Sequence, residues 1–529
     1  MDRLLLSGPQ GSLTLDYTPG PTLAELLGSG TGAIPGSCSA QGLCGLCRVQ
    51  VHHAQVDLAP ADKAEAATLG EKRLAQGWRL ACRFRPQGQV ELWLPRQETG
   101  QVWRQTSPWL PHFPAPLRAL APAEPRLGLA IDLGTTHLSL GLVDRKTGTL
   151  LQALWGQNPQ KTAGKDLLSR LSQAKDSEAR VWLQQSVGHA LAQGLGELLG
   201  LAKAAAPEVG RVSLVGNRAM LALFLGLEPD SLLDPNRWED SAQSLEGAGL
   251  SWPQAWGLAP GTGLDLLPPL GGFVGSDLLA GIFAADVASL GEPALVIDFG
   301  TNIEIALWDG KQGWATSVAG GPAFEGSGLR FGIGAIAGAI DQLSWNPGPE
   351  PQARWVEPGP PWGLCGPGFV DLFYHLRQSG QADALGRFAP QLEGKFCFTV
   401  AGEDFWVGPK DLDRFAQAKA AVGAGILLLL RRAGIGLQEV KKLHLAGAFG
   451  QGLNLVSAQA LGLLPNLPAQ RFLRMGNAAL AGAVLALVHP QSGEKLTDLK
   501  SRFQTLNLAN QPEFEELFFS QLLLEPLAP

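Results

Sequence analysis

The sequence predicts an α/β protein of several domains, and three observations support this fold class. The chain has 529 residues, which is too many for one hydrophobic core. From Arg126 onward, apolar strand patterns alternate with helical patterns. Residues 127–144 and 294–310 share one order: a strand, an Asp-x-Gly-Thr turn and a second strand. This repeat predicts two related lobes that face each other.

The expected domain boundaries follow changes in composition. Residues 1–97 are predicted to form a small N-terminal domain of strands and a short helix around a glycine-broken loop. Residues 98–125 are rich in proline, which disfavours helices and sheet ladders, so they are predicted to be a linker. Residues 126–290 and 291–529 are predicted to be lobes I and II, with the final helices returning to the core.

The composition indicates a soluble, cytoplasmic protein that binds neither nucleic acid nor a membrane. Hydrophobic residues make up 45% of the chain and charged residues 17%, which is ordinary for a globular protein. The formal net charge of −7 argues against nucleic acid, because that partner usually requires a basic face. Apolar runs fall short of the roughly 18–20 residues that span a bilayer, and the N-terminus lacks signal-peptide features.

Four cysteines near the N-terminus have the spacing of a metal or redox site. They follow the pattern Cys38-x5-Cys44-x2-Cys47, with Cys82 in a later strand. Three thiolates from one loop and a fourth from a distant strand can bind a two-iron cluster, two sulfurs to each iron. A structural zinc site also takes four cysteines, but usually from two tight pairs, and the second pair is missing. Four reduced structural thiols are the third possibility.

The segment PGSCSAQGLCGLCRV, followed by RLACRF, resembles the cluster loop of adrenodoxin-like 2Fe–2S ferredoxins. The resemblance implies a β-grasp fold for the N-terminal domain and a 2Fe–2S cluster on the four cysteines. The remaining two cysteines are outside the pattern. We expect Cys365 to be a packed small residue and Cys397 to lie in the core.

Each of the two repeated turns has the residues that a phosphate-binding loop needs. In the first, Asp132 ends a strand, Gly134 allows a tight turn, and Thr135 and Thr136 place hydroxyls beside backbone N–H groups. The second turn repeats this order with Asp298, Gly300, Thr301 and Asn302. A carboxylate at each strand end can hold Mg²⁺ through water. Two such hairpins would bind a triphosphate from both sides, whereas glycine-rich structural turns are the alternative.

A third element, HLAGAFGQG (444–452), follows a strand in the second lobe. Together with the two turns, it resembles the actin, sugar-kinase and heat-shock-chaperone ATPases. The resemblance implies a two-lobed ATPase that binds ATP with Mg²⁺. It assigns adenosine binding to Gly447, Ala448 and Gly450.

Shorter motifs narrow the resemblance to the reductive activators of corrinoid proteins. These motifs are VGNRAM (215–220), GSD (275–277), GGPAFEG (320–326), GLCGPGFVDL (363–372), AGAFG (446–450) and GNAALAGA (476–483). They imply a nucleotide contact for Gly320 and Gly321. They also make Asp277 and Glu325 candidates for positioning the attacking water, beside Asp132 and Asp298 at the metal.

The activity that the resemblance implies is ATP-dependent, one-electron reduction of a cobalt(II) corrinoid to cobalt(I). The implied partners are a corrinoid (cobalamin-binding) protein and a low-potential electron donor. Two other functions remain open. A redox-sensing small-molecule kinase of the sugar-kinase type would need a base for a substrate hydroxyl, and no such motif is evident. A chaperone-like ATPase with a structural cluster would need a peptide-binding domain after GNAALAGA, where few residues follow.

Overall fold

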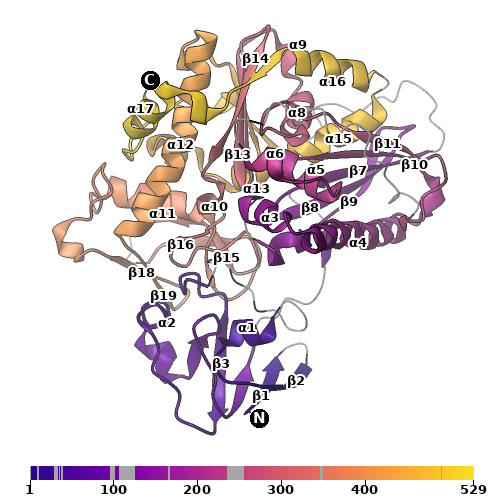
Figure 1. Cartoon of the computed structure of the whole chain (residues 1–529). Coiled ribbons are helices and arrows are strands. Elements are labelled where there is room, and N and C mark those ends of the chain that lie inside the picture. The colour runs from indigo at the N-terminus through magenta and orange to yellow at the C-terminus, as the bar shows by residue number, and fades with distance from the viewer. Residues whose placement is uncertain are drawn as a thin grey trace.

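The computed structural model describes residues 2–8, 11–28, 34, 36, 38, 40–95, 102–105, 126–164, 167–234, 237, 255–345, 350–489 and 491–528. The described residues form a small N-terminal domain and two larger lobes, each of which contains one main β-sheet (Figure 1).

The N-terminal domain is a five-stranded mixed sheet in the order β2-β1-β5-β3-β4. Its elements are β1 (Asp2–Gly8), β2 (Gly11–Tyr17), α1 (Leu23–Leu27), β3 (Arg48–Ala54), α2 (Lys63–Ala75), β4 (Trp78–Leu80) and β5 (Gln89–Trp93). β1 pairs antiparallel with β2 and parallel with β5. Helix α2 is fixed to the sheet by buried Glu65, which binds the guanidinium of Arg79 at 2.8 Å and the backbone N–H of Leu80 at 2.6 Å. This architecture agrees with the expected β-grasp fold.

Lobe I is a six-stranded sheet in the order β11-β10-β7-β8-β9-β6. Its strands are β6 (Trp103–Gln105), β7 (Leu127–Leu133), β8 (His137–Asp144), β9 (Thr149–Gln157), β10 (Val209–Gly216) and β11 (Gly263–Leu266). Its helices are α3 (Leu167–Gln173), α4 (Ser177–Ala202), α5 (Arg218–Phe224) and α6 (Asp230–Leu233). Leucines of the sheet and of α4 share one core, including Leu129, Leu140 and Leu195.

Lobe II is a six-stranded sheet in the order β21-β20-β12-β13-β14-β22. Its strands are β12 (Ala294–Phe299), β13 (Asn302–Trp308), β14 (Gly313–Ala319), β20 (Lys442–Ala446), β21 (Phe472–Gly476) and β22 (Phe503–Thr505). The long helix α12 (Pro409–Ala433) contributes a continuous set of buried side chains to the largest core.

Smaller elements surround the lobe II sheet. Two small sheets contain β15 (Ala339–Ser344), β16 (Gln352–Trp355), β17 (Gly363–Leu364), β18 (Phe396–Val400) and β19 (Glu403–Val407). The helices are α9 (Val287–Leu290), α10 (Gly321–Phe324), α11 (Gly366–Gln378), α13 (Gly447–Gly452), α14 (Leu455–Ala460), α16 (Ser492–Ser501) and α17 (Pro512–Ser520).

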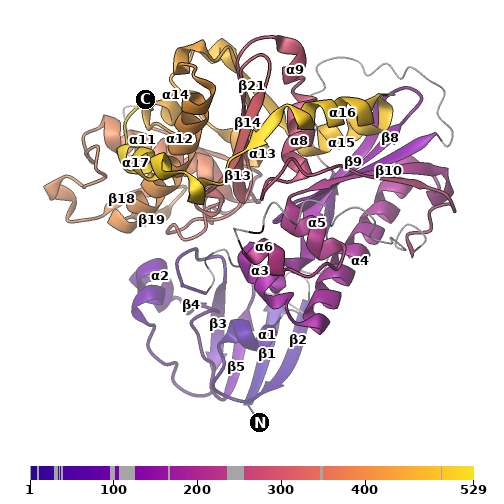
Figure 2. The same cartoon turned by 45° about the horizontal axis from the view of Figure 1, so that its top comes forward.

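The two large sheets share one topology. In each, the strand before the Asp-x-Gly-Thr turn pairs antiparallel with the strand after it and parallel with a later strand. These partners are β8 and β10 for β7, and β13 and β20 for β12. Helices α8 (Ser276–Ala284) and α15 (Ala478–Val488) share one apolar core with residues of both sheets (Figure 2). A Cβ on Gly482 of α15 would lie 2.1 Å from the carbonyl oxygen of Ala280, so α15 packs directly on α8.

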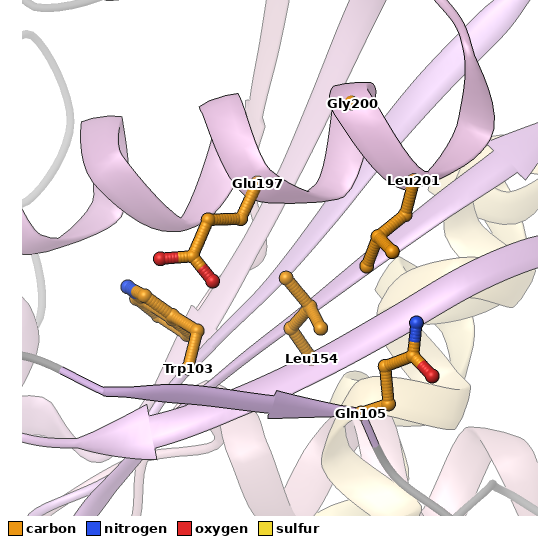
Figure 3. Close-up of a pocket in the computed structure, with 6 residues that line it drawn as sticks. All are labelled: Trp103, Gln105, Leu154, Glu197, Gly200 and Leu201. Atoms are coloured by element: carbon orange, nitrogen blue, oxygen red, sulfur yellow. The ribbon is translucent and has the colours of Figure 1, made fainter.

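A strand occurs inside the proline-rich segment predicted to be a linker. β6 pairs antiparallel with β9 at the edge of the lobe I sheet. Trp103 of β6 is buried beneath α4, beside Glu197 and Leu154 (Figure 3). Gly194 of α4 makes room for its indole, because a Cβ there would lie 2.4 Å from the ring. The connection from the N-terminal domain is therefore anchored to lobe I at β6.

Candidate functional site

The first Asp-x-Gly-Thr turn is tightly built and held by neighbouring side chains. A Cβ on Gly134 would lie 2.4 Å from the carbonyl oxygen of His137, so the turn depends on glycine. The Asn217 side-chain amide donates to the Thr135 hydroxyl at 2.9 Å. The Arg170 guanidinium donates to the Thr135 carbonyl at 2.8 Å. These contacts hold the turn in one conformation before any ligand is present.

The second turn meets the first across the cleft between the lobes. The hydroxyls of Thr136 and Thr301 lie 2.7 Å apart. The Glu325 carboxylate, from the GGPAFEG motif, accepts hydrogen bonds from Thr301 at 3.0 Å and from Thr136 at 3.3 Å. Residues from three distant segments therefore form one polar cluster at the place predicted for phosphate oxygens.

Glycines let the backbone segments of lobe II pack closely around this cluster. A Cβ on Gly321 would lie 2.0 Å from the Thr301 carbonyl, so the start of α10 packs directly on the second turn. Gly320 precedes α10 as its N-cap. Gly300 and Asn302 flank Thr301 in the turn itself.

The predicted adenosine element follows β20, the parallel neighbour of β12. Ala446 at the end of β20 lies in register with Asp298. Gly447 has φ of +80°, and a Cβ there would lie 2.4 Å from the Phe299 carbonyl and 3.0 Å from the Asp298 carboxylate. Ala448 and Gly450 continue into α13. The third element is thus brought beside the second turn.

Three aspartates face the cleft, and burial disfavours their charged forms. Burial raises the pKa of Asp132 to about 7, although the Asn477 side-chain amide donates to it at 2.7 Å. Burial raises the pKa of Asp298 to about 7, with added repulsion from Asp277 and Asp132. Burial also raises the pKa of Asp277 to about 6. Such a concentration of desolvated carboxyl groups favours a bound cation.

Glu325 and Glu304 add two more carboxyl groups to this region. Burial raises the pKa of Glu325, against the effect of its two threonine hydrogen bonds. Glu304 lies on β13 in register with Asp298, and burial followed by repulsion from Asp277 and Asp298 raises its pKa. Within the described ranges, no three His, Cys, Asp or Glu side chains are grouped closely enough to hold one metal ion.

The four cysteines of the N-terminal pattern are brought together as free, buried thiols. The Sγ atoms of Cys47 and Cys82 lie 3.4 Å apart, close enough to bind the same metal ion. The backbone N–H of Leu43 points at the Cys38 sulfur at 3.4 Å. Backbone N–H groups directed at sulfur suit a 2Fe–2S cluster, whose potential depends on such hydrogen bonds. The donor set therefore fits the implied cluster.

The other two cysteines differ from each other. Cys365 is buried as expected, and burial raises the pKa of its thiol to about 12. The expectation that Cys397 lies in the core is wrong, because this residue is exposed on β18. β18 and β19 form a two-stranded sheet, so alternate side chains of β18 point away from the lobe.

Comparisons with known proteins match all three parts of the chain. Family models match at residues 9–87 (2Fe-2S iron-sulfur cluster binding domain), 127–289 (RACo middle region) and 292–527 (C-terminal domain of RACo, the ASKHA domain). The corrinoid activation enzyme RamQ of Eubacterium limosum is 30% identical over 425 residues, covering 75% of this chain and 70% of that protein. The chain belongs to the family of reductive activators of corrinoid proteins.

Two further relatives of this family extend the comparison. The [Co(II) methylated amine-specific corrinoid protein] reductase of Methanosarcina barkeri is 25% identical over 276 residues, covering 47% of this chain and 49% of that protein. The solved structure of a reductive activator for a corrinoid, iron-sulfur protein has a TM-score of 0.64 and 23% identity. It covers 100% of this chain and 99% of its own, and supports the fold.

The family models also bear on cofactors and on the membrane. The matched N-terminal model supports a 2Fe–2S cluster, and the matched ASKHA model supports ATP binding. In the described part of the chain, no helix combines the length and apolar character needed to cross a bilayer.

Several residues at this site were not identified from sequence. They are Asn158, Arg170, Asn217, Glu304 and Asn477. Asn158 donates to the Gly134 carbonyl at 2.9 Å, and Asn477 donates to both Asp132 and Ser139. Asn217 and Asn477 lie within the VGNRAM and GNAALAGA motifs of this family, which was the available signal. For the other three, no sequence pattern marked the role.

Proposed function

We propose that this chain couples ATP hydrolysis to the one-electron reduction of cobalt(II) to cobalt(I) on a corrinoid protein. The observation that carries the proposal is the meeting of two phosphate-type turns, with Thr136 and Thr301 hydroxyls 2.7 Å apart, in a chain that also gathers four cluster-type thiols. A sugar-kinase-type enzyme or a chaperone-like ATPase is not favoured, since both lobes match models of the corrinoid-activator domains.

The proposed roles at the cleft follow the chemistry of each side chain. Asp132 and Asp298 would organise Mg²⁺ and the phosphates, because Mg²⁺ prefers a few carboxylates and retains waters. Asp277 and Glu325 would position the attacking water. Backbone and hydroxyl groups would bind the nucleotide, from Gly134, Thr135, Thr136, Gly300, Thr301, Asn302, Gly320, Gly321, Gly447, Ala448 and Gly450.

The proposed redox site is the set of Cys38, Cys44, Cys47 and Cys82. When bound there, a 2Fe–2S cluster passes one electron to cobalt(II) and receives one from an external low-potential electron donor. Thiolate ligands need a reducing compartment, which supports a cytoplasmic location. We also propose residues 1–97, 126–290 and 291–529 as the cluster domain and the two ATPase lobes, with 98–125 between them.

The test is anaerobic mixing of the purified protein with ATP, Mg²⁺, a strong reductant and candidate corrinoid proteins. The cobalt(I) absorbance should appear only when ATP is present, and Asp132→Asn should suppress it. Cobalt(I) formation at the same rate without ATP would contradict the coupling. ATP-dependent phosphorylation of a small molecule, with no cobalt(I), would favour the kinase instead.

A further inference from the structure

The end of the N-terminal domain that carries the cluster cysteines lies against lobe II (Figures 1 and 2). Cys38, Cys44 and Leu46 share one small apolar cluster with lobe II residues Ile333, Ala339 and Cys365. Beside them, the backbone N–H of Phe331 donates to the Leu43 carbonyl at 3.0 Å. This contact covers the side of the cluster loop from which an external protein could otherwise approach.

Cations and tryptophans frame the contact. The Arg330 guanidinium stacks 3.9 Å from the centre of the Trp406 ring and donates to the Thr68 hydroxyl at 3.0 Å. The Trp406 indole N–H donates to the Ala67 carbonyl at 3.0 Å. Across from them, the guanidinium of Arg48 lies 4.4 Å from the centre of the Trp362 ring.

We call the lobe II residues Arg330, Phe331, Trp362 and Trp406 the docking surface. The aromatic rings and the directed hydrogen bonds give this contact a defined orientation. An ion pair between Arg73 of α2 and Glu403 of β19 adds to it at the edge.

One short loop joins the docking surface to the nucleotide cleft. Glu325, in the cleft, and Arg330 and Phe331, on the docking surface, lie on the same loop 325–333. Gly326 has φ of +80°, and a Cβ there would lie 2.5 Å from the backbone nitrogen of Ile333, so the two ends of the loop are in contact. Its tip is held by the Arg330 backbone N–H, which donates to Asp411 at 2.7 Å. A loop closed in this way moves as a unit.

Nucleotide would compete for the groups that now hold Glu325. The hydroxyls of Thr136 and Thr301 donate to this carboxylate, and they are also the groups proposed to bind phosphate oxygens. A phosphate that takes these hydroxyls removes the hydrogen bonds of Glu325 and places negative charge beside it. The start of loop 325–333 must then shift, and the shift reaches Arg330 and Phe331.

We propose that lobe II holds the cluster end of the N-terminal domain on the docking surface, and that nucleotide in the cleft weakens this docking through loop 325–333. Release uncovers the cluster loop for an external protein partner. The domain stays close, because residues 95–102, between the last described residues of the domain and β6, span at most about 25 Å. The inference rests on the proposed function for its nucleotide and does not depend on the corrinoid.

The test measures the distance between the paramagnetic reduced cluster and a nitroxide on lobe II. Ser379→Cys in a Cys397→Ser chain provides one exposed labelling site, away from Trp406, which pairs with Cys397. Without nucleotide, we expect one narrow distance distribution. A non-hydrolysed ATP analogue with Mg²⁺ should broaden it and shift it to longer distances. By linkage, any variant that weakens docking should bind the analogue more tightly by the same factor.

Three variants sharpen the result. Arg330→Ala removes the stacking and the hydrogen bond to Thr68, so docking should weaken about tenfold and the distribution should be broad without nucleotide. Trp406→Phe keeps the ring but loses the N–H, and should give an intermediate result. Arg387→Ala is the matched control, since Arg387 is an exposed lobe II arginine paired with Asp383. It should behave as the parent chain.

An unchanged distribution with the analogue demonstrably bound would overturn the proposal, and so would a narrow distribution in Arg330→Ala without nucleotide. Failure of the proposed function looks different. A protein whose distance responds to nucleotide but that never reduces cobalt(II) would contradict the proposed function alone. Normal cobalt reduction at a fixed distance would contradict only the docking proposal.

Discussion

Replacing Asp298 by asparagine should make the nucleotide-free protein more stable at alkaline pH while it impairs ATP hydrolysis. Burial and two neighbouring carboxylates raise the pKa of Asp298 from 3.8 to about 7. At 1.36 kcal/mol per unit, the native state bears a penalty of at most about 4 kcal/mol when this group is ionised. The side chain is partly exposed in the cleft, so we expect about 2 kcal/mol.

The sign of the pH dependence follows from the raised pKa. Below pH 4 the carboxyl is protonated in both folded and unfolded chains, so Asp298→Asn should change nothing. Between about pH 4 and 7 the unfolded chain loses the proton first, and the wild-type protein loses stability relative to the variant. Above pH 7 the difference should stay constant.

The assay is thermal unfolding of the nucleotide-free protein at several pH values. About 2 kcal/mol corresponds to a rise of roughly 4–8 °C for a unit the size of one lobe at pH 8. Asp413→Asn, at an exposed position on α12 of the same lobe, is the matched control and should shift the midpoint little. With Mg–ATP, the wild-type protein should gain stability and Asp298→Asn should not. A variant less stable than wild type at pH 8 would refute the reasoning.

Three further predictions concern the cluster, the N-terminal domain and the adenosine element. Iron and sulfide assays should give about two of each per chain, and stoichiometric zinc without sulfide would exclude the cluster. The cluster spectrum should be lost on replacing Cys38, Cys44, Cys47 or Cys82 by serine, and kept on replacing Cys365 or Cys397. Glu65→Gln leaves the buried Arg79 charge uncompensated and should destabilise the N-terminal domain by about 3–5 kcal/mol, measured by denaturant unfolding; an unchanged midpoint would show that this pair is not needed. Gly447→Ala forces a Cβ to 2.4 Å from the Phe299 carbonyl at positive φ, so calorimetry should show at least about tenfold weaker ATP binding, whereas Gly434→Ala, at a positive φ with open space around it, should bind normally.

The sequence by itself determined the local features of this protein. The cysteine spacing identified the cluster loop, and the two strand-turn-strand repeats identified the two sheets, because each pattern is encoded by residues close together in the chain. β7 with β8 and β12 with β13 pair through their immediate turns, so their pairing follows from adjacent sequence. The family was also recognisable at this level, since its motifs are short and contiguous.

The tertiary structure decided every contact between segments that lie far apart in the chain. Asn477 reaches Asp132 only because α15 returns between the sheets, and no local pattern encodes that return. β6 adds to the lobe I sheet because Gly194 leaves room for Trp103. Cys397 is exposed although its neighbours are apolar, because a two-stranded sheet packs only one of its faces. The docking of the cluster loop on Phe331 likewise depends on backbone groups, which are the same in every sequence, and on the folded shapes that bring them together.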